Sequence, residues 1–352
     1  MKLGWIVTAA VLVADAGVAK AGEPVWVDAA ALRVEGRGWA DVETPYDRLP
    51  AHARSKAPQS VWGLSKQSAG IAIRFRTTAS HVFVRWSVTS AGLDMPHMPA
   101  TGVSGVDLYQ RTAGGWSFVQ NGRPTGAEGN RMTATLLAGP SPAECLLYLP
   151  LYNGCRKVEI GVEPPAKLEP AAPRRARPIV AYGTSITQGG CASRPGMAYT
   201  AIVGRILERE VINLGFSGAG LMEPAVADLL AELDPAVYVI DCLWNMGGLP
   251  DAEIEARVQN LARTLRKAHP RTPILFVGQS QIRREAHPTH PSRVQEEAVR
   301  ALQAEGVSGL FLLPGSALLT DDEGTVDGCH PNDHGMMDHA KALAPAVKRL
   351  LK

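Results

Sequence analysis

The sequence lacks an excess of charge of either sign. Its 352 residues carry 36 Lys and Arg against 34 Asp and Glu, a formal net charge of +2. A balanced charge offers little attraction to nucleic acid or to anionic lipid, so we predict neither as a partner. The only dense basic run, Arg174–Arg177, lies among prolines, which favours a solvated linker.

The sequence also lacks an apolar run long enough to span a membrane. The run from Leu3 to Val13 is far shorter than the roughly 20 residues that a span needs, which disfavours an anchor. It follows a basic start and precedes Ala-Lys-Ala, the small-x-small pattern that signal peptidase reads. We therefore predict a signal peptide at residues 1–21, a mature chain that begins at Gly22, and export to the periplasm or beyond. Removing this segment leaves a formal charge of +1.

Metal-binding patterns are the third absence. No Cys-x-x-Cys pair and no array with zinc-site spacing occurs, although His330 and His334 are four residues apart. We therefore expect neither a metal nor another cofactor.

Residues 22–162 show the period of two that is typical of half-buried strands. In the segment 71–77, Ile71, Ile73 and Phe75 alternate with polar or small residues, and 81–88 and 155–162 repeat the pattern. Residues 105–119 add two strands joined at a Gly-Gly turn. No amphipathic helix is evident, so we predict an all-β sandwich, jelly-roll-like in form.

The pattern changes after residues 163–177, a segment rich in proline, alanine and charge that we interpret as an interdomain linker. From 178 to 352, short apolar strands alternate with amphipathic helices. This alternation predicts parallel crossovers and an α/β three-layer sandwich with a central parallel sheet of about five strands. A length of 352 residues suits two cores.

Polar residues follow several of these strands where ligands bind in open parallel sheets. Ser185 comes just after the first strand, and Gly218 and Asn245 follow the second and third. After the last strand, Asp327 precedes His330 by three residues. Taken alone, Ser185 would be read as a helix cap or turn residue. Together these residues supply a nucleophile, a base, a carboxylate and amide donors, which acyl transfer requires.

These segments resemble the sequence blocks of SGNH-type (GDSL-like) hydrolases. "GTSIT", "GFSGAG", "WNM" and "DGCH" match the Ser, Gly, Asn and Asp-x-x-His blocks in order, and "GVDLY" at 105–109 resembles the β-sandwich that precedes the catalytic domain in one bacterial branch. Two departures occur. Thr184 stands where the family usually has aspartate, and Asn245 is not followed by the frequent aspartate. Neither removes a catalytic group.

The resemblance implies a triad of Ser185, Asp327 and His330, with an oxyanion hole formed by Ser185, Gly218 and Asn245. It implies a secreted serine esterase that acts on short acyl esters, acetyl in the first place, of a carbohydrate or other small ester. A lipase or phospholipase remains an alternative, although no apolar lid insertion lies between the blocks. A carbohydrate-binding protein without activity remains another.

Four residues are candidates for substrate contact. The irregular stretch 92–105, with His97 and Met98, either reaches the catalytic cleft or forms a surface connection. Arg194 can meet a sugar hydroxyl or carboxylate, or form a salt bridge to the sandwich domain. Trp244 can stack on a sugar or pack in the core.

The sequence has five cysteines, and two disulfides are possible among them in an oxidising compartment. Cys145 and Cys155 flank a strand and turn, while Cys191 and Cys329 lie in loops that converge if Ser185 meets His330. Cys242 fits a buried position. The sequence does not decide the oligomeric state.

Overall fold

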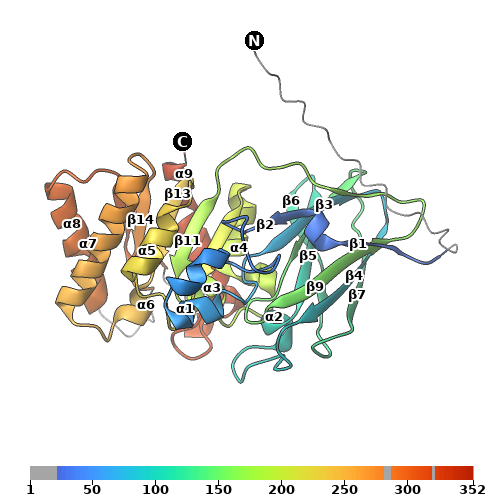
Figure 1. The fold of residues 1–352 in the computed structure, drawn as a ribbon, viewed down its shortest axis with the longest axis horizontal. Coiled ribbons are helices and arrows are strands. Elements are labelled where there is room, and N and C mark those ends of the chain that lie inside the picture. The colour runs from blue at the N-terminus through green and yellow to red at the C-terminus, as the bar shows by residue number, and fades with distance from the viewer. Residues whose placement is uncertain (1–21, 281–286, 319–321, 352) are drawn as a thin grey trace, which may run out of the picture.

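A computed structural model describes residues 22–280, 287–318 and 322–351. The described chain forms a β domain and an α/β domain that lie side by side (Figure 1). The predicted signal peptide falls outside the described residues. Within the described part, no helix has the length and apolar character to cross a bilayer.

The amino-terminal domain is the predicted β-sandwich. One antiparallel sheet has the order β1-β9-β4-β7, and the other has the order β10-β3-β8-β5-β6 with β2 paired to β3. Side chains that alternate along the strands, such as Ile73 and Phe75, meet between the sheets in one core. The strands are β1 (Val25–Asp28), β2 (Arg33–Glu35), β3 (Ala72–Thr77), β4 (His81–Val88), β5 (Val106–Thr112), β6 (Gly115–Gly122), β7 (Asn130–Thr135), β8 (Ala143–Tyr148), β9 (Cys155–Val162) and β10 (Leu168–Pro170).

The carboxy-terminal domain is the predicted three-layer α/β sandwich. Its parallel sheet has the order β12-β11-β13-β14-β15, so the first strand lies inside the sheet. The strands are β11 (Ile179–Gly183), β12 (Val211–Gly215), β13 (Val237–Asp241), β14 (Ile274–Val277) and β15 (Leu310–Leu313). Every residue of β11 and β13 is buried, as expected for strands covered on both faces.

Helices cover both faces of this sheet. Residues of α4 and α9 pack in one core, and residues of α5, α7 and α8 pack in the other. Neighbouring residues of β11 divide between the two cores, Ile179 in one and Val180 in the other. The helices are α3 (Ser185–Gln188), α4 (Tyr199–Leu207), α5 (Pro224–Ala231), α6 (Leu243–Met246), α7 (Asp251–Ala268), α8 (His290–Ala304) and α9 (Asp333–Leu350).

Residues 36–71, between β2 and β3, depart from the predicted division into domains. This segment holds the short helix α1 (Gln59–Leu64), where we predicted no helix. Leu49, Val61 and Trp62 are buried in the core of the α/β domain, and Figure 1 shows the blue α1 among the yellow and orange elements of that domain. Part of the amino-terminal half therefore belongs structurally to the α/β domain.

The predicted linker is also more ordered than its composition indicates. Its residues 168–170 form β10, an edge strand that pairs with β3. Farther along, Arg174 donates to both carboxylate oxygens of Glu35 in β2 at 3.0 Å. The connection is thus tied to the sandwich by backbone and side-chain bonds.

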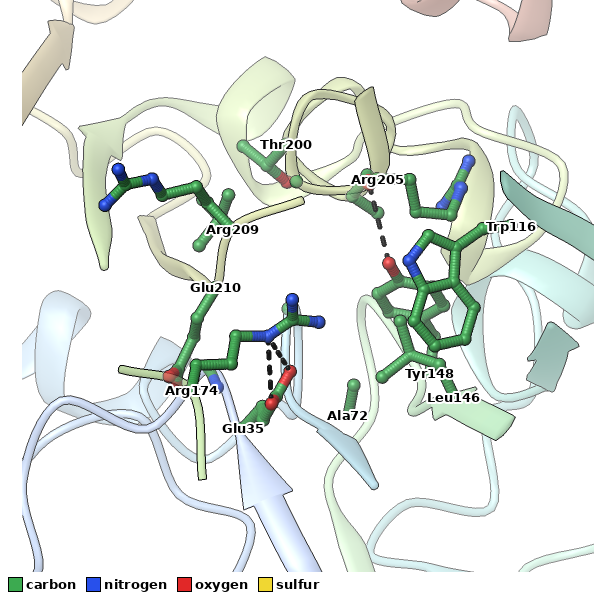
Figure 2. Close-up of a pocket in the computed structure, with 15 residues that line it drawn as sticks. Glu35, Ala72, Trp116, Leu146, Tyr148, Arg174, Thr200, Arg205, Arg209 and Glu210 are labelled. Carbon is green, nitrogen blue, oxygen red and sulfur yellow. Dashed lines mark hydrogen bonds and ion pairs between the residues drawn. The ribbon is translucent and has the colours of Figure 1, made fainter. Parts of the chain in front are cut away.

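A small pocket lies at the junction of the domains (Figure 2). It has a volume of about 30 Å³. The Arg174–Glu35 pair lines it, and so does Tyr148, whose hydroxyl donates to the carbonyl of Ala201 at 3.4 Å. This space suits about one water molecule and is too small for a sugar or an acyl group. The junction is packed rather than open.

Candidate active site

Ser185 is placed by the turn that joins β11 to α3. Thr184 caps α3, because its hydroxyl accepts the backbone N–H of Ile186 at 3.2 Å. A Cβ at Gly183 would lie 2.1 Å from the hydroxyl of Thr187, so this close approach requires glycine. Ser185, at the first position of α3, retains 7% exposure at the carboxyl edge of the sheet.

Ser185, His330 and Asp327 form one chain of hydrogen bonds. The Oγ of Ser185 lies 2.8 Å from Nε2 of His330, and Nδ1 of His330 lies 2.7 Å from Oδ2 of Asp327. The tautomer that satisfies both contacts has Nδ1–H donating to Asp327 and Nε2 accepting from the serine hydroxyl. The geometry suits a hydroxyl nucleophile with an adjacent general base.

Backbone groups hold the Asp327 carboxylate. Its Oδ1 accepts the N–H groups of Cys329 at 2.9 Å and His330 at 2.8 Å. Partial burial acts to raise the pKa of Asp327, but these bonds and the His330 ring outweigh it and lower the pKa to about 2. The carboxylate is therefore ionised at neutral pH and can stabilise an imidazolium.

Gly218 and Asn245 present amide groups at the same edge. Gly218 has a φ of 69°, and a Cβ there would meet no atom within 4 Å, so its surroundings are open. The Oδ1 of Asn245 accepts the N–H of Gly220 at 3.1 Å. Asn245 is partly exposed, and among the described residues its Nδ2 group has no hydrogen-bond acceptor. Both can donate to a developing oxyanion.

The sandwich domain also reaches this site. The His97 ring has its centroid 6.0 Å from that of His330, and the Tyr152 hydroxyl donates to the backbone carbonyl of Ser185 at 3.2 Å. The stretch 92–105 therefore contacts the catalytic domain beside His330, while substrate contact by His97 stays a prediction. Sequence reasoning did not single out Tyr152, because nothing in its local pattern distinguishes it from a residue of the sandwich.

Three of the predicted substrate contacts have other partners. Arg194 donates to Oδ2 of Asp107 and to the hydroxyl of Tyr109, both at 2.7 Å, which is the salt bridge to the sandwich left open above. Met98 is 2% exposed and packs in the core of the α/β domain, so it is not available as a contact. Trp244 is partly buried, and its Nε1 donates to Ser280 at 2.8 Å.

The contacts of Asp107 explain what the "GVDLY" motif does in the structure. The carboxylate of Asp107 is fully buried and accepts the N–H of Gly196 at 2.8 Å in addition to Arg194. Gly196 and Arg194 lie in the loop that follows the nucleophile helix. The motif thus docks the sandwich domain on the segment that carries Ser185.

A second acid and imidazole pair lies buried near the nucleophile. Asp241, at the end of β13, accepts the hydroxyls of Tyr199 at 3.0 Å and Thr187 at 3.3 Å, while Nε2 of His339 is 3.7 Å from Oδ2 of Asp241. Burial raises the pKa of Asp241 to about 6 and lowers that of His339 to about 4. Thr187 couples this pair to α3, two residues beyond Ser185.

All five cysteines are free thiols, so neither of the two possible disulfides is formed. Cys145 and Cys155 are both buried in the core of the sandwich. Burial raises the pKa of both Cys191 and Cys329 to about 12. Over the described ranges, no group of three or more His, Cys, Asp or Glu side chains is arranged to hold a metal ion.

Comparisons with known proteins agree with this geometry. Residues 176–348 match the model of the GDSL-like lipase/acylhydrolase family, and residues 24–168 match that of the amino-terminal domain of SGNH-hydrolase-type esterases. A protein described as a GDSL-like lipase from Bacteroides ovatus is 35% identical, with a TM-score of 0.83 over 94% of this chain and 98% of that one. No curated protein matches the chain.

Two more distant structures share the fold. The salicylyl-acyltransferase SsfX3 from a tetracycline biosynthetic pathway is 19% identical, with a TM-score of 0.77 over 94% of this chain and 98% of that one. An acetyl xylan esterase, Est2A, from the rumen bacterium Butyrivibrio proteoclasticus is 13% identical, with a TM-score of 0.61 over 93% of this chain and 98% of that one.

Proposed function

The chain belongs to the family of GDSL-like lipases and acylhydrolases, and on that premise we propose a serine esterase that releases short acyl groups, acetyl in the first place, from carbohydrate. The observation that carries the proposal is the hydrogen-bonded chain from Ser185 through His330 to Asp327, with contacts of 2.8 and 2.7 Å. Export is part of the proposal and rests on the composition of residues 1–21.

The reaction begins with the serine hydroxyl. Ser185 Oγ attacks the ester carbonyl carbon while Nε2 of His330 takes its proton, and Asp327 stabilises the imidazolium. The oxyanion accepts hydrogen bonds from the backbone amides of Ser185 and Gly218 and from the Nδ2 group of Asn245. Collapse breaks the bond to the alcohol, which leaves with the proton from His330.

Water completes the cycle. His330 takes a proton from a water molecule, whose oxygen attacks the acyl-serine and forms a second tetrahedral intermediate. Its collapse returns the proton to Ser185 Oγ and frees the acid. The same groups serve both half-reactions, so the residues described here need no cofactor for the chemistry.

The compact loops between the family blocks support a short acyl chain, because they offer little apolar surface to a long one. The carbohydrate assignment is supported by the shared fold of an acetyl xylan esterase and of family two carbohydrate esterases. Exposed polar groups such as His97 beside the triad suit a polar alcohol moiety better than a lipid.

The test compares hydrolysis of 4-nitrophenyl acetate, butyrate and octanoate by the wild type, Ser185→Ala and Ser308→Ala. Ser308 is an exposed serine just before β15, at the opposite edge of the sheet, and serves as the matched control. We expect the acetate to be preferred and only Ser185→Ala to lose activity. A rate that rises steadily to octanoate would favour a lipase, and no turnover would favour a binding protein.

Acetate release from a panel of acetylated glycans then tests the carbohydrate assignment. We expect at least one glycan to be deacetylated faster than triacetin at equal ester concentration. Equal or lower rates on every glycan would contradict a carbohydrate substrate while leaving the esterase activity in place.

Export is tested by sequencing the amino terminus of the exported protein, which should begin at Gly22.

A further inference from the structure

Arg48 is a buried cation without an acidic partner. It lies in the segment between β2 and β3, and none of its surface is exposed. Its Nε donates to the carbonyl of Gln67 at 2.8 Å and its Nη2 to that of Leu64 at 2.7 Å. No carboxylate within the described part of the chain forms an ion pair with it. Burial lowers the pKa of Arg48 to about 9, so the group is still charged at neutral pH.

The other donors of Arg48 hold the strand that leads to Gly218. Nη1 donates to the carbonyls of Gly215 at 2.6 Å and Asn213 at 3.3 Å, at the end of β12. The guanidinium also lies 4.8 Å from the centroid of the Phe216 ring. Three of the residues just before Gly218 therefore contact a single side chain.

A second connection fixes the residue next to Gly218. The Oε1 of Gln188, the last residue of α3, accepts the N–H of Ser217 at 3.0 Å. Nε2 of the same side chain donates to Oε1 of Gln67 at 2.5 Å, and Arg48 holds the backbone of Gln67. The nucleophile helix and the Gly218 loop are thus joined through residues of the amino-terminal half.

An unpaired buried charge is costly, because the surrounding carbonyls replace water only in part. An apolar side chain would avoid that cost but would leave the carbonyls of Gln67, Leu64, Gly215 and Asn213 without these donors, so the hydrogen bonds to both segments account for arginine here. A loop held in advance by such bonds keeps its amide in place while the oxyanion forms, and a preorganised donor favours the transition state more than the ground state.

We propose that Arg48 is a positioning residue for the oxyanion hole: its hydrogen bonds fix the loop that presents the Gly218 amide. The inference rests on the proposed esterase function and assigns part of the active site to the amino-terminal half. That half is then a component of the catalytic unit and not a separable module.

The experiment compares Arg48→Met and Arg48→Lys with Arg54→Met. Arg54 lies six residues away in the same segment, and its side chain is 72% exposed, so it controls for loss of a cation there. kcat and KM for 4-nitrophenyl acetate are measured from pH 6 to 8, below the lowered pKa of Arg48, with thermal unfolding at each pH. We expect Arg48→Met to lower kcat by about 100-fold, with KM changed by less than about threefold.

The lysine variant supplies a readout that a purely structural role would not move. Lysine has a lower ordinary pKa than arginine, and burial lowers it further, so a lysine here loses its charge between pH 6 and 8, where Arg48 keeps its own. Arg48→Lys should therefore lose kcat as the pH rises, while wild type and Arg54→Met keep theirs and all remain folded. This profile tests the proposal even if Arg48→Met does not fold.

Two results overturn the inference. One is a pH profile of Arg48→Lys that runs parallel to that of the wild type, and the other is a folded Arg48→Met with the kcat of Arg54→Met. Either result leaves the esterase function in place, because the wild type is active in the same assay. A wild type without activity would overturn the proposed function and this inference together.

Discussion

Replacing Asp327 with asparagine separates the catalytic effect of this carboxylate from its effect on stability. Asparagine keeps an oxygen that can accept the backbone N–H groups of Cys329 and His330, which Asp327 binds at 2.9 and 2.8 Å. Its NH2 group, however, faces Nδ1 of His330 as a donor. The ring is then driven to the tautomer in which Nε2 carries the proton and no longer accepts one from Ser185.

The structure sets the size of both effects. Loss of the tautomer lowers kcat by about 10⁴ where the acid is buried, but the Asp327 side chain is 42% exposed, so we expect about 10³, equivalent to about 4 kcal/mol. The pKa of Asp327 is lowered from 3.8 to about 2, which corresponds to about 2 kcal/mol of stability before screening. Screening at this exposure reduces that to about 1 kcal/mol.

The sign of the stability effect follows from the lowered pKa. The native state holds the Asp327 proton less tightly than the unfolded state, so the stabilisation is full above about pH 4 and is lost as the pH falls toward 2. Asp327→Asn should therefore unfold within about 4 °C of the wild type at pH 7. A variant that retains more than a tenth of the wild-type kcat while folded would refute the reasoning.

The control is Asp251→Asn, because Asp251 pairs with His290 at the same 2.7 Å on an exposed surface. We expect its kcat and thermal unfolding to match those of the wild type. An equal loss of activity in both variants would point to a general effect of removing a carboxylate.

Three further predictions follow from the site. Asn245→Ala should lower kcat for 4-nitrophenyl acetate by about 10² with little change in KM, and a change in KM alone would argue against an oxyanion donor. Burial lowers the pKa of His339 to about 4, so the stability that neutral His339 contributes is lost as the pH falls from about 6.5 to 4. In urea unfolding, His339→Phe should therefore lose less stability than the wild type over that range. Parallel losses of stability would contradict this. Burial raises the pKa of Cys191 and Cys329 to about 12, so these thiols should react slowly with a disulfide reagent at pH 8. All five thiols should react once the unreduced protein is unfolded, and fewer than five reactive thiols would reveal a disulfide.

The sequence was sufficient to predict the fold of each domain, and it proposed Ser185 and His330 as residues of the site. Alternating strands and helices imply a parallel sheet, and a parallel sheet brings the carboxyl ends of its strands to one edge. Residues 145 positions apart in the chain could therefore be expected to meet there. The match to the family blocks then reduced the many polar residues of the sequence to a few candidates for the site.

Contacts between the two halves of the chain could not be predicted in the same way. Trp62, Met98 and Tyr152 lie in stretches whose local pattern suits a surface loop or a sandwich strand, yet each contacts the α/β domain. From the sequence, Arg194 was equally suited to contact a substrate or to form a salt bridge to the sandwich domain. Its actual partner, Asp107, lies 87 residues earlier in the chain. Such pairings follow from docking geometry, which no local period encodes.

The central claim, that Ser185 is the nucleophile activated by His330, is tested most directly by phosphorylation with diethyl 4-nitrophenyl phosphate. The reagent transfers its diethyl phosphoryl group to an activated serine and releases 4-nitrophenol, and peptide mass spectrometry locates the adduct. We predict one adduct per chain, on Ser185, with parallel loss of esterase activity and little labelling of folded His330→Gln. An adduct on another residue, or full activity in protein that is fully labelled on Ser185, would contradict the account.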